Sequence, residues 1–179
     1  MRSSRFLALC LVLTAAGCAR DERRPAPVPP QRPAYPAPTS PSVDISAAAY
    51  VANAAAIDLY EIRSAELALQ RSSNRAIQEF ASMMIAAHRG TSAQLSFAGR
   101  RLNLLPSATL DAKRQAMLDQ LQSSADFDRL YRDQQRTVHA EALALHRSYA
   151  ARGTSPTLRP VASAMVPIVE RHMRLLRYL

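Results

Sequence analysis

The sequence predicts an all-α protein, whose folded part is a four-helix bundle with a short extra helix between the second and third long helices. Alanine and leucine are abundant, glycine occurs only four times and tryptophan is absent. That composition favours helices over sheets. Apolar residues recur at spacings of three and four along four long stretches, which is the period of one buried helix face. A chain of 179 residues suits one such domain with appendages.

Residues 1–17 have the features of a bacterial lipoprotein signal peptide. Arg2 and Arg5 precede a short apolar run from Phe6 to Ala16, which is typical of an export signal and too short to span a bilayer as a helix. The run ends in Leu13-Thr14-Ala15-Ala16-Gly17-Cys18, which resembles a lipobox. An ordinary secretory cleavage nearby is the alternative.

Cys18 is the residue that we expect to be lipidated, and its lipid would anchor the protein to a membrane. Ala19 follows it, and by resemblance to enterobacterial sorting rules this favours the outer membrane, with the protein facing the periplasm. Residues 18–43 carry eight prolines and almost no core-forming residues, so we expect an extended tether. A proline-rich ligand for a partner is the less favoured interpretation.

Residues 44–179 are the predicted domain, and its first two helices form a hairpin. Asp44 is the expected N-cap of the first helix, and a buried stripe follows at the helical period. Glu61 lies on that stripe and is expected to be the only inward carboxylate at its level. Ser72-Ser73-Asn74 ends this helix and caps the next, on whose stripe His88 lies. The connection is short, so the two helices should be antiparallel and the two ionisable residues close in height.

The second half of the domain contributes three more predicted helices. A short amphipathic helix covers Leu110 to Gln122, and a long one covers Ala125 to Ala151, with His139 at the edge of its apolar stripe. Gly153, Ser155 and Pro156 end that helix and start the last one. Its predicted buried face comprises Val161, Met165, Ile168, His172, Leu175 and Leu179. The spacing is compatible with a simple meander and with a long crossover.

Several residue groups together resemble a bacterial family, the domain of unknown function numbered four-one-four-two. They are Leu59-Tyr60-Glu61-Ile62, Phe80-Ala81 with Met83 and His88, Phe127-Asp128 with Tyr131, His139, and Pro167 five residues before His172. The resemblance covers roughly residues 46–179. It implies a ferritin-like fold and an outer membrane location, but no established activity. Members commonly have an acidic residue just before the second-helix histidine, and here that position is Ala87.

Glu61, His88, His139 and His172 lie near the middle of their helices, and we expect them to meet in the bundle core. Three imidazoles and one carboxylate would suit a single zinc, copper, nickel or iron ion. The chain has no Glu-x-x-His motif, which disfavours di-iron chemistry. The alternative is a hydrogen-bond network that binds nothing and fixes helix register in a structural or interaction module, because a buried carboxylate needs partners in either case.

An enzyme acting on small molecules ranks third, because no nucleophile or cofactor motif is present. His146 is interpreted as a half-exposed surface histidine, with an outer metal ligand as the less favoured alternative. The formal charge of +9 reflects an arginine-rich composition, and Arg129, Arg132 and Arg136 are interpreted as a solvated face. We therefore expect no nucleic-acid partner; envelope lipids and cell-wall acids are the available anions. The oligomeric state cannot be derived from these patterns.

Overall fold

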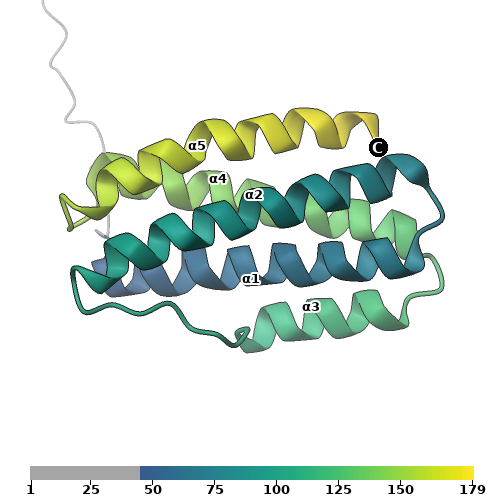
Figure 1. Ribbon diagram of the computed structural model, residues 1–179, viewed down its shortest axis with the longest axis horizontal. Coiled ribbons are helices and arrows are strands. Elements are labelled where there is room, and N and C mark those ends of the chain that lie inside the picture. Colours follow the sequence, from purple (N-terminus) through teal and green to yellow (C-terminus); the bar gives the residue numbers. More distant parts are fainter. Residues whose placement is uncertain (1–44) are drawn as a thin grey trace, which may run out of the picture. The chain divides into compact units, whose positions relative to one another are not determined.

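The computed structural model describes residues 45–179, and this part of the chain is helical. The helices are α1 (Ala47–Arg71), α2 (Arg75–Arg100), α3 (Ala112–Ser123), α4 (Phe127–Arg152) and α5 (Leu158–Leu175), followed by the 3-10 turn η1 (Leu176–Tyr178). Figure 1 shows the long helices α1, α2, α4 and α5 packed along one another, with the short α3 alongside. The all-α prediction is confirmed. Cys18, the lipobox and the proline-rich segment lie outside the described residues.

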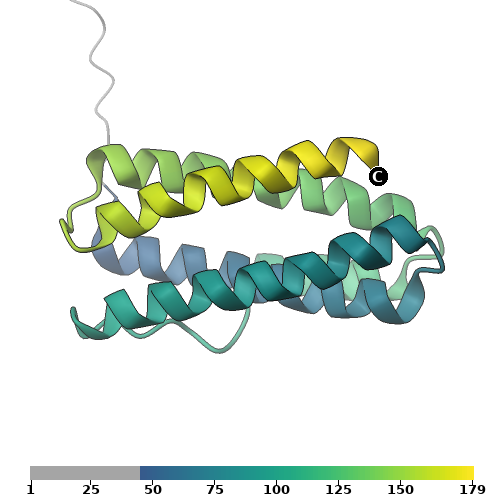
Figure 2. The same ribbon diagram turned by 45° about the horizontal axis from the view of Figure 1, so that its top comes forward.

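The four long helices are connected with one long crossover. The start of α1 lies at the end of α4, where Ala47 donates its backbone N–H to Thr154 over 3.1 Å. The end of α1 lies at the start of α4, where the guanidinium of Arg71 stacks over Phe127 at 4.9 Å. Because α1 is antiparallel to both α2 and α4, those two helices are parallel. The chain therefore returns along the bundle between them, through the segment that contains α3 (Figures 1 and 2).

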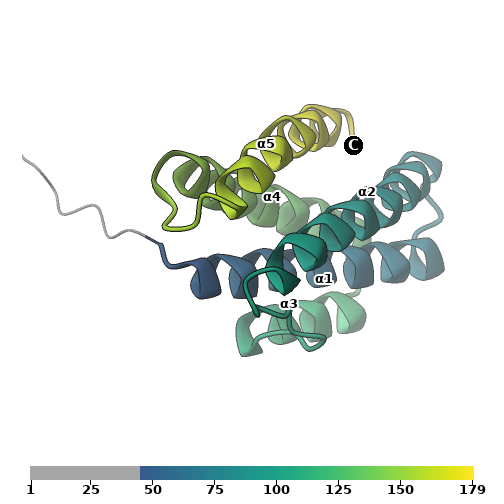
Figure 3. The ribbon, with the colours of Figure 1, turned by 60° about the vertical axis from the view of Figure 1, so that its left-hand side comes forward.

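Each long helix packs against two neighbours, and the order around the bundle is α1, α2, α5, α4 (Figure 3). α3 packs outside this square, against α1 and α4. The guanidinium of Arg71 on α1 fixes the C-terminal end of α3, because it donates to the carbonyls of Leu121, Gln122 and Ser124 at 2.6–3.2 Å. The long-crossover arrangement also occurs in ferritin-like folds, but the likeness to that superfamily stays a prediction.

The caps explain most of the helix boundaries. Ser46, and not Asp44, caps α1, because its hydroxyl accepts from the N–H of Ala49. Asn74 caps α2 as predicted, and Asp111 caps α3, which therefore starts two residues later than expected. α2 ends at Arg100, where the backbone N–H groups of Leu102 and Leu104 both donate to the carbonyl of Gly99. The carbonyl of Leu104 lies so close to Gly99 that there is no space for a Cβ. Asn103 adopts a left-handed backbone there, with φ at 56°, which asparagine tolerates better than most residues.

The apolar core forms two clusters at opposite ends of the bundle and a third between them. One surrounds Tyr131 and Ile77, and the opposite one surrounds Tyr149 and Tyr50, whose rings stack at 3.9 Å. The predicted stripe of α1 is buried, and so is that of α2 except for its last residue, Leu102, which is half-buried and follows the helix. The predicted face of α5 was partly wrong: the buried residues are Leu158, Ala162, Met165, Val169, His172 and Leu176. The buried face of α5 packs against both α2 and α4. Only Met165 and His172 belong to both the predicted and the observed buried face.

No helix among residues 45–179 combines the length and the apolar character that a bilayer crossing requires.

Candidate metal centre

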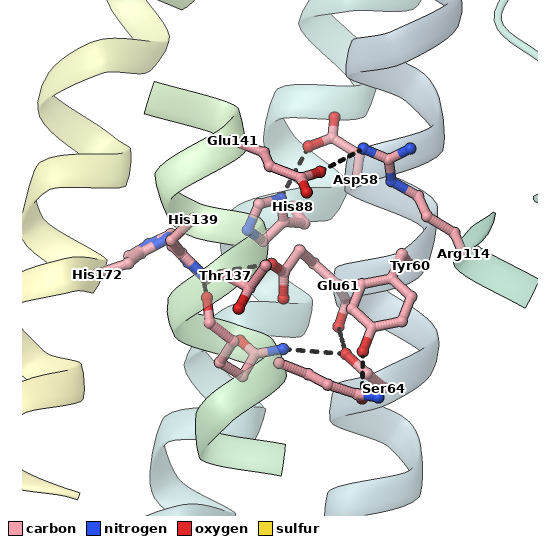
Figure 4. A network of polar contacts seen from close by, with 12 residues as sticks. Asp58, Tyr60, Glu61, Ser64, His88, Arg114, Thr137, His139, Glu141 and His172 are labelled. Carbon is pink, nitrogen blue, oxygen red and sulfur yellow. Dashed lines mark hydrogen bonds and ion pairs between the residues drawn. The ribbon is translucent and has the colours of Figure 1, made fainter. Parts of the chain in front are cut away.

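Three histidines from three helices meet in the middle of the bundle. His88 comes from α2, His139 from α4 and His172 from α5, and one potential ligand nitrogen of each lies within 4.8 Å of the others. All three side chains are buried, with 1–4% of their surface exposed. Nε2 of His139 lies 3.4 Å from Nδ1 of His172. The sequence-predicted convergence of these histidines is therefore present in the structure (Figure 4).

Oxygen acceptors orient two of the three rings. Nδ1 of His88 lies 2.8 Å from a carboxylate oxygen of Asp58, and Nδ1 of His139 lies 2.8 Å from the carbonyl of Gln135. A carbonyl oxygen only accepts hydrogen bonds, so Nδ1 of His139 carries the proton and Nε2 keeps its lone pair. Neutral His88 has the same tautomer for the same reason. Metal-binding histidines are commonly held in this way, by an acceptor on the nitrogen away from the ion.

Nε2 of His88 is buried and has no hydrogen-bond partner among the described residues. Such an atom costs free energy, on the order of 1–3 kcal/mol, unless something satisfies it. Burial disfavours the charged form of His88, but the hydrogen bond that His88 donates to Asp58 and the charges of Asp58 and Glu61 outweigh burial and raise its pKa. A charged His88 would bury an unpaired N–H, and a neutral one an unpaired lone pair. In both protonation states, Nε2 of His88 therefore lacks a hydrogen-bond partner within residues 45–179.

The other two histidines are neutral at physiological pH. Burial and the nearby charge of His88 lower the pKa of His139 to about 3, against a smaller opposing effect of the carbonyl of Gln135. Burial also lowers the pKa of His172 to about 4, helped by the charges of His88 and Arg171. Neutral imidazole is the form that binds metals, so neither ring has to lose a proton first.

Glu61 is buried beside His139 but is not part of the three-histidine group. Its Oε1 lies 3.3 Å from Nδ1 of His139, the nitrogen whose N–H is directed at the carbonyl of Gln135. Neither carboxylate oxygen has a hydrogen-bond partner in residues 45–179. Burial raises its pKa to about 7, and the charge of His88 and the amide of Gln135 offset only part of that effect. Its predicted role as the fourth ligand stays a prediction.

Asp58 is the functional residue that the sequence reasoning missed. It is buried one helical turn before Glu61, so the expectation that Glu61 is the only inward carboxylate at this level was wrong. Besides His88, its two oxygens accept from the hydroxyls of Thr91 at 2.9 Å and Ser92 at 3.0 Å. Its spacing from Ala54 and Glu61 is helical, and that was the available signal. The oxygen that orients His88 thus comes from α1, and not from the position of Ala87.

His146 was also predicted wrongly, because it is buried and not half-exposed. Its Nδ1 lies 3.1 Å from the hydroxyl of Tyr50, and burial lowers its pKa to about 4 against the opposing charge of Asp58. It lies two turns beyond His139 on α4, outside the three-histidine group.

The three ligand nitrogens could bind one metal ion if the distances between them became slightly shorter. Imidazole nitrogens bound to a tetrahedral ion at about 2.0–2.1 Å lie about 3.3 Å from one another. The pair formed by His139 and His172 is already at 3.4 Å, and the spread of the whole set reaches at most 4.8 Å. The ring centroids are 5.4–6.1 Å apart, so the three imidazoles surround a common centre. The three histidines could therefore hold an ion.

Fold and site together define a class: all-α helical bundles with an ionisable cluster in the core. A family model described as a domain of unknown function (DUF4142) matches residues 32–179, and the chain belongs to that family. The resemblance drawn from the short motifs is thus confirmed at the level of the family. No curated protein and no solved structure matches the chain. The function therefore has to be inferred from the site itself.

Proposed function

We propose that this domain binds one transition-metal ion in its core through His88, His139 and His172. The observation that carries the proposal is the convergence of three buried ligand nitrogens within 4.8 Å, one of which, Nε2 of His88, has no hydrogen-bond partner among residues 45–179. The oriented rings support it, because Asp58 and the carbonyl of Gln135 direct the Nε2 atoms inward. Imidazole ligands suit zinc, copper, nickel or iron.

Glu61 is proposed to complete the site, either as a fourth ligand or by its charge. A buried carboxylate without hydrogen bonds is stabilised by a cation more than by any neutral group. In the metal-free protein a proton can take that place, because the pKa of Glu61 is raised to about 7. Glu61 lies next to Nδ1 of His139, the nitrogen that faces away from the proposed ion. Even from this position, the positive charge of the ion would stabilise the ionised carboxylate.

The alternative is a purely structural network within an interaction module. Its supporting observation is the 3.4 Å contact between His139 and His172, which would be a weak hydrogen bond between two neutral rings. Within the described residues 45–179, this network leaves Nε2 of His88 and both oxygens of Glu61 without hydrogen-bond partners. For that reason the metal site accounts for more of the buried polar atoms.

Metal analysis of the purified full-length protein separates the two functions. After exposure to zinc, copper, nickel and iron in turn and removal of excess metal, we expect about one ion per chain for the preferred metal. His88→Ala and His172→Ala should lose it, whereas His146→Ala, a buried histidine outside the group, should retain it. Negligible metal in the wild-type protein, or a content that the first two substitutions leave unchanged, would refute the metal site.

We also propose that the protein is exported and anchored through Cys18, with the domain in the periplasm and the anchor in the outer membrane. The support is the sequence of residues 1–19 alone. Labelling with a palmitate analogue should mark the wild-type protein and not Cys18→Ala. Equal labelling of the two proteins would remove the argument for the anchor.

A further inference from the structure

A small cavity lies inside the bundle on one side of the three-histidine group. It measures about 10 Å³, which is the lower limit for one water molecule and sufficient for one bare ion. All four long helices line it, and its polar lining comprises Tyr50, Asp58, His88, Thr91 and His146. The apolar cluster around Tyr50 and Tyr149 adjoins it, so this polar lining lies within an otherwise apolar part of the core.

His88 and Asp58 connect the cavity with the candidate metal centre. Both line the cavity, and His88 is also one of the three converging ligands. In Figure 4 they lie on the side of the cluster away from Ser64. His146 lies on the same side, because the end of α4 packs against the start of α1. The cavity therefore continues from the metal centre toward His146.

His146 can act as a ligand without losing its hydrogen bond. Its Nδ1 contacts the hydroxyl of Tyr50 at 3.1 Å, and a tyrosine hydroxyl can accept as well as donate. When Nδ1 donates to Tyr50, Nε2 of His146 presents a lone pair. The sulfur-containing side chain of Met165 also lines the cavity, and a thioether is a further, softer metal ligand.

Ile168 is the lining residue with the most solvent exposure. It is the one lining residue that is half-buried, whereas all the others are buried. The preceding residue, Pro167, lies inside α5 and has no N–H to donate to the carbonyl of Ser163, which weakens the helix at this level. The most exposed part of the cavity lining is therefore one side chain on a locally weakened helix.

We propose that this cavity is the route by which the metal reaches its centre, with Ile168 as the gate and His146 as a transfer ligand. The proposal rests on the metal site proposed above. The ion passes Ile168 between α2 and α5, binds transiently to His146 in the cavity, and moves on to Nε2 of His88. Neither Ile168 nor His146 belongs to the final ligand set, so the route affects the rates of binding and release and leaves the affinity unchanged.

Zinc uptake and release by the full-length protein test the route. Stopped-flow mixing with Zn²⁺ gives the uptake rate, mixing of the loaded protein with a chromophoric chelator gives the release rate, and competition gives the dissociation constant. Ile168→Ala should accelerate both rates on the order of tenfold, which corresponds to a modest fall in the barrier. Ile168→Phe and His146→Leu should slow uptake. All three variants should keep the wild-type stoichiometry and dissociation constant.

Ile85→Ala is the matched control, because Ile85 is also a half-buried isoleucine but packs against the apolar cluster at the other end of the bundle. It should keep wild-type rates. Acceleration of Ile85→Ala equal to that of Ile168→Ala would show that general loosening sets the rate and would overturn the route. Unchanged rates in both Ile168 variants, with zinc still bound, would overturn the route and leave the metal site intact. No zinc binding by the wild-type protein would overturn both.

Discussion

Replacing Glu61 with glutamine should stabilise the metal-free protein, and increasingly so as the pH rises. The carboxylate is buried, both its oxygens lack hydrogen-bond partners within residues 45–179, and burial raises its pKa from 4.5 to about 7. The folded state therefore prefers the protonated form. Glutamine has nearly the same shape and no charge, so it removes the cost of ionising this group inside the core.

The sign and size of the effect follow from linkage. A raised pKa in the folded state means that the contribution of Glu61 to stability is fully present below pH 4.5 and is lost as the pH rises through 7. The change amounts to about 3 kcal/mol at about 1.4 kcal/mol per pH unit. Between pH 5 and pH 8 the advantage of Glu61→Gln over the wild-type protein should therefore grow by about 2–3 kcal/mol.

Urea unfolding of both proteins in the presence of a chelator, at several pH values from 5 to 8, measures this difference. Glu66→Gln provides the control, because it makes the same change at a half-exposed position on the same helix. Its stability should follow that of the wild-type protein at every pH. Parallel curves for wild type and Glu61→Gln would refute the reasoning. Bound metal should abolish the advantage of glutamine, because the ion then compensates the carboxylate.

The remaining predictions concern the residue that orients His88 and two glycines of α2. Asp58→Asn should weaken metal binding about 10–100-fold, as loss of an outer partner usually does, and competition with a chelator would show it; an unchanged affinity would contradict this role. Gly99→Ala should lower the unfolding free energy by about 2 kcal/mol or more, because the new Cβ would collide with the carbonyl of Leu104. Gly90→Ala has open space around it and should raise the unfolding free energy by up to about 1 kcal/mol. Thermal or urea unfolding checks both, and equal effects of the two substitutions would contradict the packing argument.

The positions of Glu61, His88 and His172 were predictable because each falls on the periodic stripe of its helix, and all are buried. Periodicity gives the direction of a side chain relative to one helix axis. It does not give the width of the buried face, which depends on how many neighbours the helix contacts. α1 contacts α2, α3 and α4 and buries a wide face, and for that reason Asp58 was missed.

His146 and the face of α5 were mispredicted for a related reason. Whether a residue beside a stripe is buried depends on which neighbouring helix covers it, and this is a property of the assembled bundle. Tyr50 on α1 covers His146 on α4, a pairing across 96 residues of sequence. Crossover and meander likewise give the same stripes on each helix, so the order of helices around the bundle required the structure.

The sequence could not separate a metal site from a structural network because both satisfy the same groups. In the metal-free core, protons can occupy Glu61 and His88, whose pKa values are raised. A divalent ion supplies equivalent positive charge at the same place, and it also uses the lone pairs of His139 and His172, which take up protons only in acid. Metal uptake is therefore an exchange of an ion for protons, favoured as the pH rises toward 7 and beyond. Protons or an ion can compensate the buried charges, but only the metal-bound state gives Nε2 of His88 a partner, since that atom has none among residues 45–179.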